Sequence, residues 1–405
     1  MQVQVPHPSV RQGTEKAAVT PLELFFDLVF VFALTQVTAF LADDLSWHGL
    51  LRGLLVILLL WWAWTGYAWL ANIASADQGP IKALMLVSMS AMFVLALCIP
   101  QAFDDSDGGL SAPMVLAVCY LVFRLGHLAM FFYLAGEDSG LRRQLLRWLP
   151  SVLGSTALLM LAAQFEGAAR TGCWAAALAV DYVGTAAAGA RGWRLPAPGH
   201  FAERHGLILI VALGESIVAI GVGVADHPIS WAIVLASVLG LVVASAMWWA
   251  YFDISAALGE HALADEPAET RPRLGRNAYS FAHLPLMAGV VLVALGMKKV
   301  LEYVSAIETH TLTDPLKGVA LAALFWGPVI YLLGHVAFKW LTTHQISVVR
   351  LVTAGLLLLG WLVAASVPAL AQLAVVAAIL AGAVAVETIL YAEHRRQVRA
   401  ELTDA

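Results

Sequence analysis

The sequence predicts an all-α integral membrane protein with about 12 transmembrane helices, arranged as two parallel six-helix repeats. Three observations favour this fold class: an apolar composition, a series of long apolar runs, and an uneven placement of basic residues. Hydrophobic residues make up 60% of the 405 residues, and charged residues make up only 13%. Soluble domains average about 45–50% apolar and about 25% charged residues, so the composition indicates a membrane protein.

Twelve apolar runs approach or exceed the length of about 20 residues that a helix needs to cross a bilayer. The first six are expected at residues 22–41, 49–71, 81–101, 111–135, 146–163 and 172–190. The second six are expected at residues 205–225, 229–253, 277–298, 316–339, 347–367 and 370–391. The last two runs are separated by Ser366-Val367-Pro368.

The placement of lysine and arginine predicts the orientation, because cytoplasmic loops carry an excess of both. With the N-terminus inside, 17 of the 23 basic residues, Arg350 among them, fall on the cytoplasmic side, 5 fall outside, and Arg124 lies within a span. We therefore expect both termini in the cytoplasm. The expected divisions are a cytoplasmic tail at 1–20, a first repeat at 21–191, a second repeat at 192–393, and a cytoplasmic tail at 394–405.

Short segments of the first six runs recur in the second six in the same order. The pairs are FALTQV (32–37) with VALGES (211–216), WWAWTGY (61–67) with WWAYFDI (248–254), RLGHLAMF (124–131) with LLGHVAFK (332–339), and LAVDYVGTA with VAVETILYA. Chance similarity between apolar helices is the alternative to duplication. Six spans in each copy would bring both copies into the membrane from the same side, and in such folds the substrate path lies between the halves.

The first span begins with a local capping pattern. Thr20-Pro21-Leu22-Glu23 has the spacing of a capping box, with Thr20 as the N-cap and Glu23 reaching back to the N-cap amide. Thr20 and Glu23 are therefore assigned to helix capping. Asp27 lies one turn deeper, beyond the reach of that cap.

Ionisable and polar residues inside the spans are expensive in hydrocarbon and usually mark function. The candidates for an ion or proton path, or for a buried charge network, are Asp27, Arg124, His127, Asp181, Glu215, Ser216, Asp253, His283, His335 and Glu387. Glu203, Arg204 and His205 at the start of the second repeat are candidates as well. We expect Arg124 to be the counter-charge of Asp27. That pair, together with Asp181, would either hold helices in register or line an ion path.

Two histidines occupy equivalent places in the predicted repeats. His127 and His335 could relay protons near neutral pH, bracket a haem or a metal, or serve only as hydrogen-bonded packing residues. Glu215 and Ser216 stand among glycines that allow close helix packing.

Motifs of soluble enzymes are absent from the sequence. There is no Walker A loop, GxSxG elbow, HExxH motif or dinucleotide fingerprint, and the three cysteines form no CxxC pair. We expect no enzyme activity, no cofactor and no metal. The expected partners are the lipid bilayer and a small cation or proton. Nucleic acid is not expected, and a homo-oligomer is an open possibility.

Several segments resemble the bacterial low temperature requirement protein A family. They are ELFFDLVFVFALTQV (23–37), WWAWTGYAWLAN (61–72), YLVFRLGHLAMFFY (120–133), HFAERHGLILIVALGESIVAIG (200–221) and WWAYFD (248–253). The family is named for a cold-growth phenotype, and its members are multi-pass bacterial membrane proteins. The resemblance therefore implies a place in the bacterial inner membrane. FFDLVFVFALT is also similar to the first helix of a family of lysosomal and bacterial potassium channels, with Phe26 where those carry serine.

The leading hypothesis is a transporter or channel for a small cation or proton, using a buried polar layer. Asp27 and Glu215 would titrate or attract the ion, and Arg124 would set their charge state. A first alternative is a non-transporting structural or sensory membrane protein that supports growth in the cold, in which the buried charges are fixed ion pairs. A second alternative is an intramembrane redox or haem protein.

Overall fold

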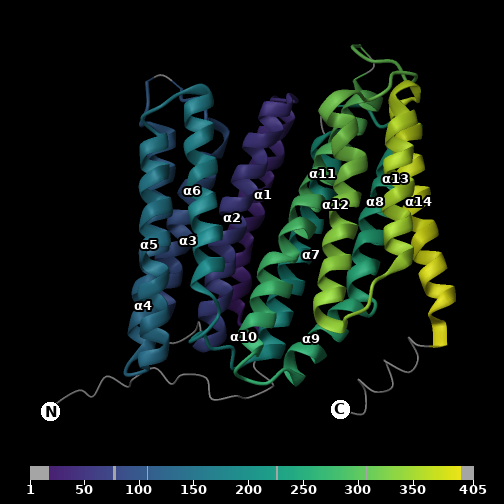
Figure 1. Cartoon of the computed structure of the whole chain (residues 1–405). Helices are drawn as coiled ribbons and strands as arrows, with labels where there is room; N and C mark the ends of the chain where they lie inside the picture. Colours follow the sequence, from purple (N-terminus) through teal and green to yellow (C-terminus); the bar gives the residue numbers. More distant parts are fainter. Residues whose placement is uncertain (1–17, 76–78, 107, 225–226, 307, 394–405) are drawn as a thin grey trace. The chain divides into compact units, whose positions relative to one another are not determined.

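The computed structural model describes residues 18–75, 79–106, 108–224, 227–306 and 308–393. All regular secondary structure in these ranges is helical (Figure 1). The predicted tails at 1–20 and 394–405 lie outside the described residues, except for residues 18–20.

Each predicted span corresponds to one long helix in the described part of the chain. The first six helices are α1 (Pro21–Asp43), α2 (Trp47–Ile73), α3 (Gly79–Leu97), α4 (Ala112–Ala135), α5 (Ser139–Ala162) and α6 (Gly167–Ala188). The second six are α7 (Pro198–Val222), α8 (Trp231–Phe252), α11 (His283–Ser305), α12 (Gly318–Thr343), α13 (Val348–Val363) and α14 (Ala369–Leu390). The shorter elements are η1 (Ile99–Gln101), α9 (Ser255–Asp265), α10 (Arg271–Leu274), the π-helix η2 (Gly275–Phe281) and η3 (Ala364–Ser366).

The predicted break between the last two spans is confirmed. The chain leaves α13 through the short helix η3, and Pro368 is the N-cap of α14. Proline suits this place because it lacks the amide hydrogen that would continue the preceding helix.

Length and apolarity identify an all-α, multi-pass membrane protein. Eleven helical segments of the described chain are long and apolar enough to cross a membrane, and α6 falls outside that set. The burial pattern on α1 agrees with a lipid environment: Phe25 and Leu28 are 54% and 57% exposed, whereas Glu23 and Asp27 are 0% and 1% exposed. Apolar residues outside and charges inside are expected for a helix surrounded by hydrocarbon.

The chain forms two compact units. Unit 1 comprises residues 1–36, 55–204 and 263–276, and unit 2 comprises residues 37–54, 205–262 and 277–405. In unit 1, α3 packs on α4 and α5 packs on α6. In unit 2, α11 packs closely against α12, and α14 packs against α8 and α13.

Small residues explain the close packing of α11 and α12. A Cβ atom at Gly289 would lie 2.6 Å from the carbonyl oxygen of Gly327, and one at Gly327 would lie 2.7 Å from the backbone nitrogen of Val293. Larger side chains would push the two backbones apart, so these glycines set the separation of the helices.

Candidate functional site

The capping box predicted at the start of α1 is confirmed. The Thr20 amide donates to Glu23 Oε2 at 2.7 Å, and the Glu23 amide donates to Thr20 Oγ1 at 3.3 Å. Each residue thus satisfies a backbone donor that the first helical turn leaves unpaired. The predicted capping by Thr20 and Glu23 is therefore present in full.

Glu23 also binds two basic residues of α7. His200 Nε2 lies 3.0 Å from Glu23 Oε1, and Arg204 Nη1 lies 3.4 Å from the same oxygen. All three side chains are completely buried. Glu23 therefore caps α1 with one oxygen and joins a charge cluster with the other.

Asp27 is held by Arg204 and Trp64. Arg204 Nη2 donates to Asp27 Oδ1 at 2.7 Å, and Trp64 Nε1 donates to the same oxygen at 2.8 Å. The Arg204 guanidinium also lies over the Trp64 ring, 5.6 Å from its centroid. The expected pairing of Asp27 with Arg124 is wrong: the counter-charge of Asp27 is Arg204, which reaches it from the first turns of α7.

We call Glu23, Asp27, His200 and Arg204 the α1–α7 cluster. Among the described residues, these four side chains form ion pairs only with one another. Two carboxylates face one guanidinium, so with a neutral imidazole the cluster carries one net negative charge. Such a charge is costly away from water, and a proton or a cation removes the cost.

Some polar atoms of the cluster are not engaged. The buried atoms without a hydrogen-bond partner in the described part of the chain are Asp27 Oδ2, His200 Nδ1, Arg204 Nε and Arg204 Nη1. Asp27 therefore has one oxygen held by two donors and another that can take a proton or a cation. Of the two Asp27 carboxylate oxygens, Oδ2 is therefore the one with free capacity for a proton or a cation.

Arg124 instead pairs with Asp181 of α6. Arg124 Nη1 lies 2.8 Å from Asp181 Oδ2, and Arg124 Nη2 donates to Asp181 Oδ1 at 2.9 Å. The Tyr120 hydroxyl donates to Asp181 Oδ2 at 3.2 Å and accepts from Arg124 at 3.0 Å. Ser151 and Ser155 of α5 also donate to the Asp181 carboxylate. This bidentate pair has equal charges of opposite sign and ties three helices together.

His127 lies in an aromatic environment. Its ring is 5.2 Å from the Tyr67 ring, 4.8 Å from the Phe131 ring and 5.4 Å from the Trp148 ring. A Cβ atom at Gly66 would lie 2.9 Å from its ring. These contacts describe a packed side chain and favour the packing interpretation of His127 over a ligand role.

In unit 2, Arg350 of α13 pairs with Glu387 of α14. Arg350 Nε donates to Glu387 Oε1 at 2.9 Å, and Arg350 Nη2 donates to Glu387 Oε2 at 3.2 Å. Arg350 also donates to His335 Nδ1, which is thereby an acceptor. The structure thus brings the predicted residues His335 and Glu387 together around Arg350, a residue expected on the cytoplasmic side.

The other predicted residues lie as follows. His283 begins α11, where its Nδ1 lies 2.9 Å from the Ala278 carbonyl oxygen and its Nε2 lies 2.8 Å from the Tyr251 hydroxyl. The His205 ring lies 5.3 Å from the His283 ring. Asp253 is the C-cap of α8. The remaining three are Glu215 and Ser216, which are buried on α7, and Glu203, which accepts from the Val19 amide at 3.3 Å.

The π-helix η2 precedes His283 and orients it. A carbonyl oxygen only accepts, so His283 Nδ1 carries a hydrogen and Nε2 accepts from Tyr251. The Tyr279 ring, from within η2, stacks on the His283 ring at 5.1 Å. Within the described ranges, no three His, Cys, Asp or Glu side chains are grouped as metal ligands.

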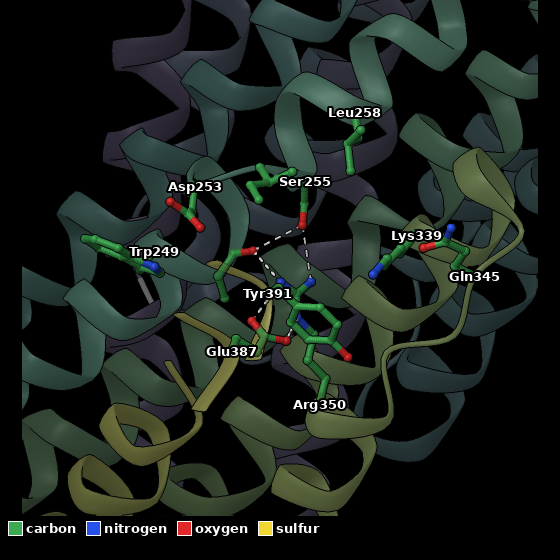
Figure 2. A pocket seen from close by; sticks show the side chains of 11 residues that line it. Trp249, Asp253, Ser255, Leu258, Lys339, Gln345, Arg350, Glu387 and Tyr391 are labelled. Carbon is green, nitrogen blue, oxygen red and sulfur yellow. Dashed lines mark hydrogen bonds and ion pairs between the residues drawn. The ribbon is translucent and has the colours of Figure 1, made fainter. Parts of the chain in front are cut away.

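A polar cavity of about 90 Å³ lies beside the Arg350–Glu387 pair in unit 2 (Figure 2). Its walls come from α8, α9, α12, α13 and α14 and from the loops that follow α8 and α12. The polar residues that line it are Asp253, Ser255, Lys339, Gln345, Arg350, Glu387 and Tyr391. The volume accommodates several water molecules, each of which needs at least about 10–15 Å³.

Two important residues were missed in the sequence, His200 and Arg350. His200 and Arg204 are four residues apart on α7, as Glu23 and Asp27 are on α1. Residues at this spacing share a helix face. The acidic pair on α1 and the basic pair on α7 could therefore have been predicted to face each other. Arg350 lies within the predicted run 347–367, and Glu387 needed a cation.

Among the comparisons with known proteins, the family models identify one family. The model for the family "Bacterial low temperature requirement A protein (LtrA)" matches residues 18–385. A protein of Rhizobium meliloti (strain 1021), described as uncharacterized protein RA0937, is 28% identical over 355 residues, which covers 81% of this chain and 79% of the relative. No solved structure matches the chain.

Proposed function

We propose that this chain, which belongs to the bacterial low temperature requirement A protein family, moves protons or a small monovalent cation across a membrane. The α1–α7 cluster would be the site that binds and releases the ion. The observation that supports the proposal is the charge imbalance of this buried cluster, where two carboxylates share one guanidinium.

The bound ion would sit at Asp27. Its Oδ1 is held by Arg204 and Trp64, whereas Oδ2 lies free of hydrogen bonds from the described residues. A proton on the cluster, or a cation at Asp27 Oδ2, brings the net charge of the four groups to zero. Loading and unloading would therefore alternate between a neutral and an anionic centre, which an ion-carrying site requires.

His200 supplies a second place for the same proton. Its Nε2 contacts Glu23 Oε1, and its other ring nitrogen has no hydrogen-bond partner in the ranges that the structure covers. An imidazole can take up a proton on one ring nitrogen and release one from the other, so His200 is suited to pass a proton to or from Glu23. His200, rather than the predicted His127, would be the relay of this site.

The basic-residue asymmetry gives the proposed orientation. Both termini would be cytoplasmic in a bacterial inner membrane, since 17 basic residues fall on that side and 5 on the other. The cluster would then lie toward the cytoplasmic end of α1 and α7, because Glu23 and His200 stand in the first turns of these helices.

Ion flux into liposomes tests the proposal. Purified full-length protein is reconstituted with an internal pH dye, and gradients of protons, potassium and sodium are imposed in separate experiments. We expect the wild type to dissipate one gradient faster than empty liposomes. Asp27→Asn should abolish that flux, because the amide neither ionises nor balances a cation.

Asp314→Asn is the matched control, since Asp314 lies in a loop of unit 2 and accepts only from groups of its own turn. It should transport as the wild type does. A wild type that behaves like empty liposomes for all three ions would exclude transport of these ions by the chain.

A second candidate is a non-transporting membrane protein whose buried charges hold the helices together. The specific observation in its favour is that Arg124–Asp181 and Arg350–Glu387 are pairs of one guanidinium and one carboxylate, each joined by two contacts. This candidate predicts no flux, and it predicts a loss of thermal stability from Asp27→Asn comparable with that from Asp181→Asn.

A further inference from the structure

The cavity beside Arg350 and Glu387 suits a ligand other than the proton or small cation of the proposed function. It lies in unit 2 near the C-terminal ends of α8, α12 and α14 (Figure 2). Its lining combines aromatic residues with basic, acidic and amide side chains. The chemistry of the ligand follows from which of these groups still have hydrogen bonds to give.

Arg350 has no free hydrogen-bond donor left for a ligand. Its Nε donates to Glu387, and its Nη2 donates to Glu387 and to the Ala250 carbonyl oxygen. Its Nη1 donates to His335 and, at 3.4 Å, to the Ser255 hydroxyl. The five hydrogens of the guanidinium are thus committed, and its charge is balanced by Glu387.

Lys339 is the uncommitted cation of this cavity. Its ammonium forms no ion pair with a carboxylate in the described ranges, and its contact is with the Tyr391 ring, whose centroid is 6.0 Å away. The Tyr391 hydroxyl and the Gln345 amide also line the cavity and make no hydrogen bond within the residues that the structure describes. Three side chains that can donate hydrogen bonds therefore line the same cavity. They are Lys339 of α12, Gln345 of the following loop, and Tyr391, the C-cap of α14.

The acidic residues do not cancel this donor set. Glu387 is paired with Arg350 and accepts a further hydrogen bond from Ser347 at 3.2 Å. Asp253 lies on the other side of Arg350 from Lys339 (Figure 2). The Lys339 side of the cavity is therefore positive and rich in donors, which is the environment of an oxyanion.

Exposed aromatic side chains surround this part of unit 2. Trp249 and Tyr391 line the cavity and are 36% and 40% exposed, and Trp340, next to Lys339, is 52% exposed. Tryptophan and tyrosine gather where a membrane protein meets lipid headgroups. A basic recess at that level is suited to an anionic headgroup.

We propose that this cavity binds a phosphate group, with Lys339 as its cation and Tyr391 and Gln345 as hydrogen-bond donors. The phosphate would belong to a phospholipid headgroup or to a soluble phosphate. Both present the same tetrahedral oxyanion to the three donors. This site is separate from the α1–α7 cluster and does not depend on the proposed transport.

Binding to the purified full-length protein tests the proposal. Native mass spectrometry counts bound phosphatidylglycerol and phosphatidylcholine, and a thermal-shift titration with inorganic phosphate tests the soluble source. The variants are Lys339→Ala, the conservative Lys339→Arg, and Lys317→Ala. Lys317 precedes the first residue of the same helix and is exposed, so it is the matched control.

Lys339→Ala should weaken binding about tenfold, as expected for a lost charge-assisted hydrogen bond. Lys339→Arg and Lys317→Ala should bind nearly as the wild type does. A lysine-dependent effect with lipid alone assigns the headgroup, and one with inorganic phosphate assigns a soluble ligand. Equal binding by Lys339→Ala and Lys317→Ala, or no binding of any phosphate compound by the wild type, would overturn the proposal.

Discussion

The α1–α7 cluster of unit 1 and the Arg350–Glu387 pair of unit 2 differ in the ratio of carboxylates to guanidinium groups. In unit 2 one guanidinium meets one carboxylate through two hydrogen bonds, and its other hydrogens go to neutral acceptors. In unit 1 one guanidinium is divided between two carboxylates. The balanced pair requires nothing from outside, whereas the unbalanced cluster needs a proton or a cation.

The Arg124–Asp181 pair sharpens this contrast within unit 1. It resembles the unit 2 pair in charge balance, but its arginine comes from α4, whereas Arg350 comes from α13. In the predicted repeat, Leu332 of α12 corresponds to Arg124 and Glu387 corresponds to Asp181. Both pairs join one guanidinium to one carboxylate, although the arginine comes from a different helix in each unit.

The largest effect is expected from Arg204→Leu. The substitution leaves two buried carboxylates without their guanidinium, and breaking a buried ion pair costs about 3–5 kcal/mol. The free energy of unfolding in detergent should fall by that amount. Adding Asp27→Leu should recover only part of the loss, because Glu23 remains beside His200. Full recovery in the double variant would show that the cluster is a simple pair after all.

A similar loss of unfolding free energy is expected from Arg350→Leu. Substituting its carboxylate partner as well should have a different result from the Arg204 case. The single substitution strands Glu387 and should cost about 3 kcal/mol, less than a fully buried pair because the Glu387 side chain is 19% exposed. Arg350→Leu with Glu387→Leu removes both charges and should recover most of the stability. Chemical denaturation of the four proteins in this cycle measures the coupling, and an uncoupled result would contradict the balanced pair.

The sequence predicted the helices well because each depends on a local quantity, the length of an apolar run. The capping of α1 by Thr20 and Glu23 was predicted for the same reason, since its partners are three residues apart. The partner of Asp27 was not predicted. Arg204 lies 177 residues away in the chain, and a charge in an apolar run requires a partner without specifying which one.

The position of Arg350 shows another limit of sequence reasoning. Basic residues near the end of an apolar run are normally cytoplasmic, so Arg350 was counted with the loop. Its side chain instead turns inward and is 9% exposed, because Glu387 on α14 and the Ala250 carbonyl of α8 supply its acceptors. Only the packing of three helices, which no local pattern encodes, determines that direction.

A smaller effect is expected from Trp64→Phe. The indole donates the second hydrogen bond to Asp27 Oδ1, and a hydrogen bond to a charged group contributes about 1.5–3 kcal/mol. Stability should fall by about 2 kcal/mol, and the ion affinity of the cluster should change because Oδ1 regains binding capacity. Trp148→Phe, next to the balanced Arg124–Asp181 pair, is the control for ring packing. It should leave any flux unchanged, since the Trp148 indole donates to Thr185 and not to a carboxylate.

The smallest effects are expected at the surface, from Asp138→Ala and from the substitution of its ion-pair partner Arg194. Asp138 is the N-cap of α5 and accepts from the Gly140 and Leu141 amides at 2.9 and 3.0 Å. Loss of such a cap costs about 1 kcal/mol. Arg194→Ala removes only its exposed ion-pair partner, 2.9 Å away, and should cost less than about 0.5 kcal/mol.

Asp138 also makes the free energy of unfolding depend on pH, and the sign of that dependence is definite. Partial burial alone would raise the pKa of Asp138, but the Leu141 amide, Arg194 and the Gly140 amide outweigh it, so the pKa lies below its ordinary value of 3.8. A lowered pKa means that the stabilisation is complete above about pH 4 and is lost as the pH falls through the folded-state value. The stability difference between the wild type and Asp138→Ala should therefore shrink below pH 4. A difference that stays constant down to pH 2 would show that the neutral carboxyl caps α5 as well as the carboxylate does.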